Sequence, residues 1–205
     1  MSWPATSRYQ LDAAPGSLAF VQDFVNTIPA GKPRGPDLLA DLPDAQRWLD
    51  EALAQWRHTR GVTADDVVLN EADLVKLRAI RAGLVSRIRA GTTDPGAPDD
   101  DHLALSAATK MQLDAHGRVH AVPNGKGWRY VASALLIEIY DAQRDGAWRH
   151  LKTCCNHRCS AAFFDRSRNN SRVWHDVTVC GNLANLHAHR ARKRAEHNTP
   201  ERHAP

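Results

Sequence analysis

Apolar positions in the first 150 residues repeat mainly at the spacing of an α-helix. Over residues 16–28, apolar side chains recur three and four positions apart, which predicts a helix with a wide buried face. Asn70 is typical of a helix N-cap, and an apolar stripe continues from it to about residue 89. The same spacing predicts two more helices, over 44–56 and 128–147. The first part of the chain is therefore predicted to be mostly helical.

One segment alternates between apolar and polar residues, which is the pattern of a β-strand. The alternation covers 109–113 and resumes after a short turn-forming stretch. This arrangement predicts a β-hairpin over 107–122. Segments rich in glycine and proline predict loops at 29–36 and 91–101, and a short helix is expected to begin within 97–104.

Composition places the chain among ordinary folded proteins. Of its 205 residues, 42% are apolar, which is enough for the core of one domain, or of one domain with a small appendage. No apolar run is long enough for a transmembrane helix, and the first ten residues do not resemble a signal peptide. We therefore expect a cytoplasmic protein with no membrane partner.

Four potential metal ligands lie in two pairs of equal spacing near the C-terminus. Four residues separate Cys154 from Cys159, four separate His175 from Cys180, and fifteen lie between the pairs. Such pairs are typical of a tetrahedral Zn²⁺ site, and the segment has too few apolar residues to fold without a metal. Because Cys155 is adjacent, either it or Cys154 can be the first ligand. Two disulfides are the alternative, which a reducing compartment disfavours.

Positive charge is concentrated in the same part of the chain. Residues 150–205 hold ten Lys or Arg and four Asp or Glu, a net +6, whereas 1–149 hold seventeen and nineteen, a net −2. A basic helix is predicted over 183–197, where zinc would anchor it for contact with DNA phosphates and bases. A solvated basic helix end is the alternative. The residues expected to contact DNA are Arg166, Arg168 and Arg172 in the loop between the ligand pairs, and Arg190, Arg192, Lys193 and Arg194 in the helix.

The stretch 151–183 resembles the CGNR zinc finger. That family has two cysteines four residues apart, an aromatic–aromatic–Asp–x–Ser–Arg–Asn run, a Trp–Cys pair and a Cys–Gly–Asn–Arg sequence, and 163–169 matches the run closely. Upstream, 18–27 is similar to the Asn–Thr signature that opens the ABATE domain, which precedes this finger in bacterial transcription regulators. The resemblance implies bound zinc, a DNA partner and Cys154 as the first ligand.

Two positions depart from the pattern of the family. His175 stands where the family has its third cysteine, and zinc accepts either residue. Leu183 stands where the family has the arginine of its name motif. If that arginine contacts DNA or braces the finger in relatives, its loss would weaken DNA binding by this chain. In the upstream signature, Asn26 and Thr27 are candidates for lining a ligand pocket, although such residues more commonly cap a turn.

Together these features predict a fold that is mainly α with a small β-hairpin (α+β). We expect a helical ABATE-like domain over 1–149, a small treble-clef-like zinc finger with its basic helix over 150–197, and a disordered tail over 198–205. The predicted function is that of a zinc-dependent, DNA-binding transcription regulator. Its N-terminal domain is expected to sense a small-molecule effector or to form a homodimer.

Two other functions fit the same residues. Zinc can shape a surface for a protein or an RNA, and Cys155 beside zinc-bound thiolates allows a thiol-based redox sensor. An enzyme is not expected, because four protein ligands close the zinc site and the chain carries no familiar catalytic motif. No catalytic residue is assigned.

Overall fold

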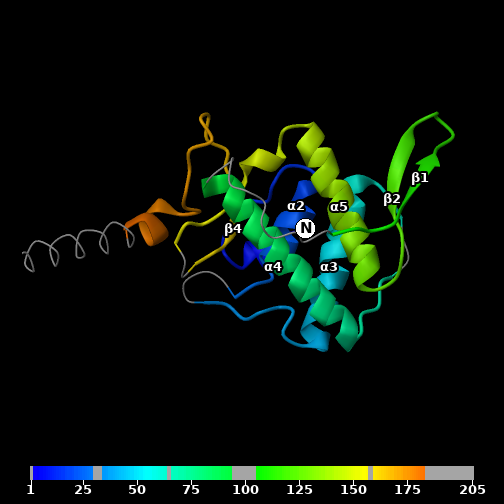
Figure 1. Cartoon of the computed structure of the whole chain (residues 1–205), viewed down its shortest axis with the longest axis horizontal. Coiled ribbons are helices and arrows are strands. Elements are labelled where there is room, and N and C mark those ends of the chain that lie inside the picture. Colours follow the sequence, from blue (N-terminus) through cyan, green and yellow to red (C-terminus); the bar gives the residue numbers. More distant parts are fainter. Residues whose placement is uncertain (1, 30–33, 64–65, 94–104, 157–158, 183–205) are drawn as a thin grey trace, which may run out of the picture.

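Helix α2 (Leu18–Val25) lies at the centre of the molecule, where it contacts the helices around it (Figure 1). The computed structural model describes residues 2–29, 34–63, 66–93, 105–156 and 159–182. Around α2 pack the short α1 (Pro4–Ser7) and three longer helices, α3 (Leu42–Arg60), α4 (Glu71–Thr93) and α5 (Trp128–Arg144). The predicted helical body is confirmed, and α3 extends at both ends beyond the predicted 44–56.

All eight residues of α2 are buried, including two polar ones. Its aromatic rings pack on α3, with centroids 6.0 Å apart for Phe20 and Trp56 and 5.8 Å apart for Phe24 and Trp48. The carboxylate of Asp23 accepts hydrogen bonds from a backbone N–H of α1 at 2.7 Å and from Trp48 Nε1 at 2.9 Å. Burial nevertheless raises the pKa of Asp23 to about 6. Since such buried polar groups have partners, α2 can be enclosed on all sides.

The start of α4 follows the capping prediction, whereas its end does not. Asn70 Oδ1 accepts from the backbone N–H of Asp73 at 3.0 Å, and the Asp73 carboxylate accepts from the N–H of Asn70 at 2.9 Å. This reciprocal capping box confirms the predicted N-cap. The predicted stop at Gly91 is wrong, because the helix continues to Thr93. A single glycine costs a helix only about 1 kcal/mol, which a long helix tolerates. The short helix expected within 97–104 lies outside the described residues.

The predicted hairpin is confirmed. Strand β1 (Thr109–Leu113) pairs antiparallel with β2 (Val119–Pro123), and the backbone N–H of Asp114 donates to the carbonyl of Arg118 at 2.9 Å across the turn. The hairpin stands at the side of the helical body, with β2 next to α5 (Figure 1).

A second ribbon, which the sequence pattern did not predict, joins the body to the cysteine-rich segment. Strand β3 (Leu151–Thr153) pairs antiparallel with β4 (Ala162–Phe164), and they contact α4 and α2 respectively. Leu151 and Ala162 are part of the same apolar core as α2. A 3₁₀ turn (Trp148–His150) precedes this ribbon, and a π-helical turn, η2 (Val177–Gly181), follows it.

The fold is therefore a helical region followed by a smaller cysteine-rich region, with two antiparallel hairpins, as the predicted α+β class requires. The last helix of the predicted treble-clef-like finger lies outside the described residues. No helix in the described ranges has the length and apolar character needed to cross a membrane.

Candidate metal centre

The four predicted metal ligands lie together in the structure. One ligand atom from each of Cys154, Cys159, His175 and Cys180 falls within 4.8 Å of the others. The Nδ1 atom of His175 is 3.3 Å from the Sγ of Cys159 and 3.7 Å from that of Cys180. Ligand atoms of a tetrahedral zinc–thiolate site are roughly 3.8 Å apart, given a Zn–S bond of about 2.3 Å. The four residues are thus positioned to bind a metal ion, consistent with zinc.

Local backbone geometry brings the first pair of ligands together. Cys154 follows β3, and its N–H donates to the carbonyl of Ala161 at 2.9 Å, which extends the β3–β4 pairing by one position. The N–H of Cys159 donates to the carbonyl of Asn156 at 2.8 Å in a tight turn. Ser160 then has φ = 58°, a left-handed conformation that reverses the chain into β4. The ribbon therefore forms a knuckle that holds both thiols on one side.

A capped turn supplies the last ligand. The side chain of Asp176 accepts from the backbone N–H of Val179 at 2.9 Å, and its carbonyl accepts from the N–H of Cys180 at 3.0 Å. The indole ring of Trp174 lies against Gly181, where a Cβ atom would be 3.2 Å from the ring. This cap satisfies backbone N–H groups at the start of the turn that carries Cys180.

The ambiguity between the adjacent cysteines is resolved by their burial. Cys154 is 1% exposed and belongs to the cluster, whereas Cys155 is exposed and lies outside it. The backbone N–H of Cys155 donates to the carbonyl of Val173 at 2.9 Å, and its thiol is not among the clustered ligand atoms. None of the four cysteines forms a disulfide, so the disulfide alternative is wrong.

The clustered thiols perturb one another strongly. A hydrogen bond from Cys154 lowers the pKa of Cys159 to about 4, with further help from His175. The same bond and burial raise the pKa of Cys154 far above the ordinary thiol value, and burial raises that of Cys180. Buried thiolates this close cannot all ionise without a compensating cation. A divalent metal ion supplies that charge and deprotonates coordinating thiols.

The cluster packs directly against the helical body. Tyr9, Leu11 and Ile28 from the body lie against the cysteines, together with Trp174. The hydroxyl of Tyr9 donates to the carbonyl of Ile28 at 2.7 Å. The metal centre therefore shares an apolar surface with the N-terminal region.

Asn26 and Thr27, the candidate pocket residues, lie in the interior with their polar atoms bonded to the protein. The Asn26 side chain donates to the carbonyl of Ala162 at 3.0 Å and accepts from its N–H at 2.8 Å. Thr27 Oγ1 donates to the carbonyl of Phe24 at 2.6 Å and accepts from Arg81 at 3.0 Å. Both side chains are fully buried. In this structure Asn26 joins the end of α2 to β4, the strand next to the metal ligands.

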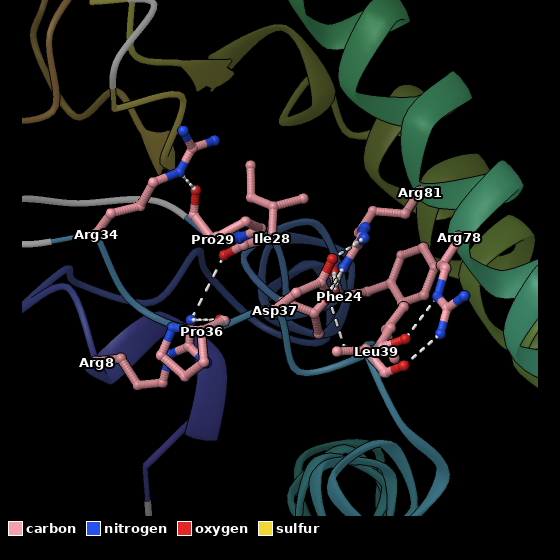
Figure 2. A network of polar contacts seen from close by, with 12 residues as sticks. Arg8, Phe24, Ile28, Pro29, Arg34, Pro36, Asp37, Leu39, Arg78 and Arg81 are labelled. Carbon is pink, nitrogen blue, oxygen red and sulfur yellow. Dashed lines mark hydrogen bonds and ion pairs between the residues drawn. The ribbon is translucent and has the colours of Figure 1, made fainter.

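Arginines fix the segment that follows this junction (Figure 2). Arg81 of α4 makes two hydrogen bonds to the carboxylate of Asp37, at 2.6 and 2.8 Å. Arg78, one turn earlier, donates to the carbonyls of Leu39 and Ala40 at 2.6 Å each. From the other side Arg8 donates to the carbonyl of Pro36 at 3.0 Å. These contacts replace regular secondary structure in satisfying the carbonyl groups of a loop.

The aromatic–Asp run of the finger is organised by one buried ion pair. Lys152 Nζ donates to Asp165 at 2.9 Å and to the carbonyls of Asn170 and Arg172 at 2.7 and 3.1 Å. The carboxylate of Asp165, which is 0% exposed, also accepts from the backbone N–H groups of Ser167 and Arg172 at 2.8 Å each. Burial alone raises the pKa of Asp165, but these hydrogen bonds outweigh it and hold the pKa well below its usual range.

Replacing Lys152 by methionine should destabilise this loop. The change leaves Asp165 buried without its cation, which typically costs about 3–5 kcal/mol. Because folding lowers the pKa of Asp165, its contribution is present above the unfolded value of about 3.9 and is lost as the pH falls below it. The stability difference between wild type and Lys152→Met, measured by urea unfolding, should therefore be large at pH 7 and shrink in acid. Lys76→Met, at an exposed position of α4, is the control, and equal losses in both variants would contradict the assignment.

The predicted DNA-contacting arginines of the loop differ in their surroundings. Arg166 donates to the carbonyl of Ala13 at 2.7 Å, and its guanidinium lies 5.5 Å from the ring centre of Phe164. Arg172 donates to the carbonyl of His175 at 2.6 Å. Arg168 is exposed and makes no hydrogen bond or ion pair with another described residue. The remaining predicted DNA contacts lie outside the described residues, namely Arg190, Arg192, Lys193 and Arg194. So does Leu183, the position that departs from the family motif.

A hollow of about 720 Å³ lies elsewhere in the body, between α3 and residues 66–69. Leu53, Arg57 and Val67 are among its lining residues. Neither Asn26, Thr27 nor any residue of the cysteine cluster lines it.

Sequence reasoning found the ligands but missed the residues that support them. Lys152, Tyr9 and the carbonyl of Ala162 carry no motif by themselves, and their roles arise from contacts across the chain. Asp165 lies inside the aromatic–Asp run of residues 163–169, and this position could have indicated a buried ion pair.

Comparison with known families gives two matches. The model of the CGNR zinc finger matches residues 150–193. The ABATE model, described as "Putative stress-induced transcription regulator", matches residues 18–140, which is more than half of the chain. Comparison with curated proteins gives no significant match.

Proposed function

The chain belongs to the ABATE family, and from this premise we propose that it is a zinc-dependent, DNA-binding transcription regulator. In this proposal Zn²⁺ holds the finger, the finger contacts DNA, and the helical body senses a signal or mediates assembly. Such a role places the protein in the cytoplasm with the chromosome.

The observation that carries the proposal is the closed ligand set of the metal centre. Four protein ligands within 4.8 Å of one another satisfy tetrahedral zinc and leave no coordination position for a substrate. A zinc ion in such a site has a structural role rather than a catalytic one. It would join the knuckle of Cys154 and Cys159 to the turn of Cys180. The basic sequence that follows Cys180 would thereby start from a fixed point, which supports DNA binding and argues against an enzyme.

Charge supports DNA as the partner. Residues 150–205 carry a net +6 by the counts given above. In the loop, Arg168 is exposed and has no described partner to compete with a phosphate. Arg166 and Arg172 are bonded to backbone carbonyls, which leaves part of each guanidinium for a phosphate.

Charge reversal tests the DNA partner. Changing Arg190, Lys193 and Arg194 together to glutamate should weaken duplex binding by more than about 100-fold and flatten its salt dependence, since each phosphate contact contributes about 0.9 to the slope. Arg168→Glu should weaken binding by a smaller factor. Zinc content should not change in either variant.

The control matched to Arg168→Glu is Arg47→Glu, which makes the same single change from positive to negative charge on an exposed residue of α3. It should leave affinity within about twofold of wild type, because a distant surface charge is screened by salt. Unchanged affinity in the triple variant would contradict DNA binding by the finger. Binding of a protein partner that persists in high salt would favour an interaction module instead.

A further inference from the structure

The β1–β2 hairpin leaves large apolar side chains uncovered. Every residue of β1 is exposed, and Met111, Leu113 and Val119 are 68%, 71% and 60% exposed. A two-stranded ribbon is only marginally stable in water unless a further strand or a packed surface supports it. Within the described part of one chain, nothing covers these apolar side chains of the hairpin.

The uncovered apolar side chains share one face of the ribbon. Met111 pairs with Ala121, and Leu113 pairs with Val119. Because side chains alternate along a strand, these residues point to one side, while Lys110, Gln112 and His120 point to the other. Thr109 and Pro123 lie on the same face at the base of the hairpin, where Pro123 is buried and the hydroxyl of Thr109 is hydrogen-bonded to that of Ser133 of α5 at 3.3 Å. The apolar face thus begins against α5 and continues into solvent.

Among the described residues, no strand pairs with the outer edge of the ribbon. β2 contacts α5, and β1 lies on the outer side of the hairpin (Figure 1). The hydrogen bond from Asp114 N–H to the Arg118 carbonyl sets the alternation of the ladder. In that alternation the backbone groups of Met111 and Leu113 point away from β2. An edge strand of this kind is a template for another strand.

We propose that this hairpin is a dimerisation element, in which β1 pairs antiparallel with β1 of a second copy of the chain across a two-fold axis at Met111. The two-fold axis places Met111 opposite its counterpart and Lys110 opposite Gln112 of the partner copy. No like charges then face each other, so the edge is complementary to itself. Since the axis is perpendicular to the new sheet, both apolar faces lie on the same side and form one four-stranded surface.

A second copy is favoured over an unrelated strand by this self-complementarity. The pairing edge of β1 carries no excess of one charge that a different partner would have to neutralise. In the dimer the exposed apolar residues of the two hairpins form one continuous surface. The proposal is independent of DNA binding, because it uses no residue of the finger.

The proposed dimer can be tested by placing charged residues at position 111 of the full zinc-loaded chain and measuring its oligomeric state by sedimentation velocity. The wild type is expected to be a dimer. Met111→Asp and Met111→Lys, each alone, place like charges opposite each other and should raise the dissociation constant by more than about tenfold. An equimolar mixture of the two variants should recover dimers, because the facing charges are then opposite. Circular dichroism and zinc content identify any variant that fails to fold.

Gln112→Asp is the matched control, since it adds the same charge to the same strand on the opposite face. It should remain a dimer. A wild type that is monomeric at its highest soluble concentration would overturn the proposal. So would a dimer that Met111→Asp leaves intact, or a mixture of the two charged variants that stays monomeric.

Discussion

Replacing Cys180 by serine is expected to abolish stoichiometric zinc binding and to unfold the finger. Cys180 is buried within the cluster, with its Sγ 3.7 Å from His175 Nδ1. A serine hydroxyl is a poor substitute for a thiolate in a zinc site. Structural zinc contributes about 10–16 kcal/mol in isolated zinc-finger peptides, so loss of one ligand removes a large part of the free energy that holds the segment together.

The body should survive this change. Its aromatic core on α2 and α3 does not involve the cysteines. Metal analysis of the variant should therefore show loss of zinc, whereas circular dichroism should still show the helical signal. Limited proteolysis should cleave the chain in the segment after β4. Cys155→Ser is the control, because Cys155 is exposed and lies outside the cluster. Full zinc content in Cys180→Ser, or zinc loss in Cys155→Ser, would contradict the assigned ligand set.

Replacing Asn26 by alanine is expected to destabilise the protein by about 2–4 kcal/mol, although the residue is far from the ligands in sequence. The change removes both hydrogen bonds to Ala162 and leaves its N–H buried without a partner. The Ala162 carbonyl keeps a longer bond of 3.3 Å from Gln22. Since β4 is next to the knuckle, zinc should also bind less tightly in this variant.

Denaturant unfolding and competition with a chelator measure the two effects. Asn169→Ala is the control: Asn169 is exposed in the finger loop, where a substitution should change stability by less than about 0.5 kcal/mol. If Asn26 instead served only to line a ligand pocket, its replacement would leave both stability and zinc affinity near wild type. That result would refute its role as the junction of body and finger.

The sequence was informative where local pattern determines structure. Helical spacing located the long helices, Asn70 located the start of α4, and alternation over 109–113 located β1. The ligand pairs were visible because coordination requires particular residues at short spacing. The end of α4 was less predictable, since a glycine near a helix terminus is tolerated at small cost.

Contacts between distant segments were not predictable from the sequence. The β3–β4 ribbon consists of three-residue strands that are too short for a period to emerge. In the sequence, Asn26 and Thr27 at the end of α2 were compatible with a ligand pocket. Only the structure shows that Asn26 is hydrogen-bonded to Ala162 across the core. Similarly, Lys152 gives no local sign that it meets Asp165 in the interior.

The most direct test of the central claim is fluorescence anisotropy of duplex DNA titrated with the zinc-loaded chain and with the same chain after chelation. If zinc holds a DNA-binding finger, the loaded protein should bind saturably, bind more weakly as salt rises, and lose binding when zinc is removed. Restoring zinc should restore binding. Affinity that is unchanged by chelation, or absence of binding by a chain carrying one zinc per protomer, would contradict the account.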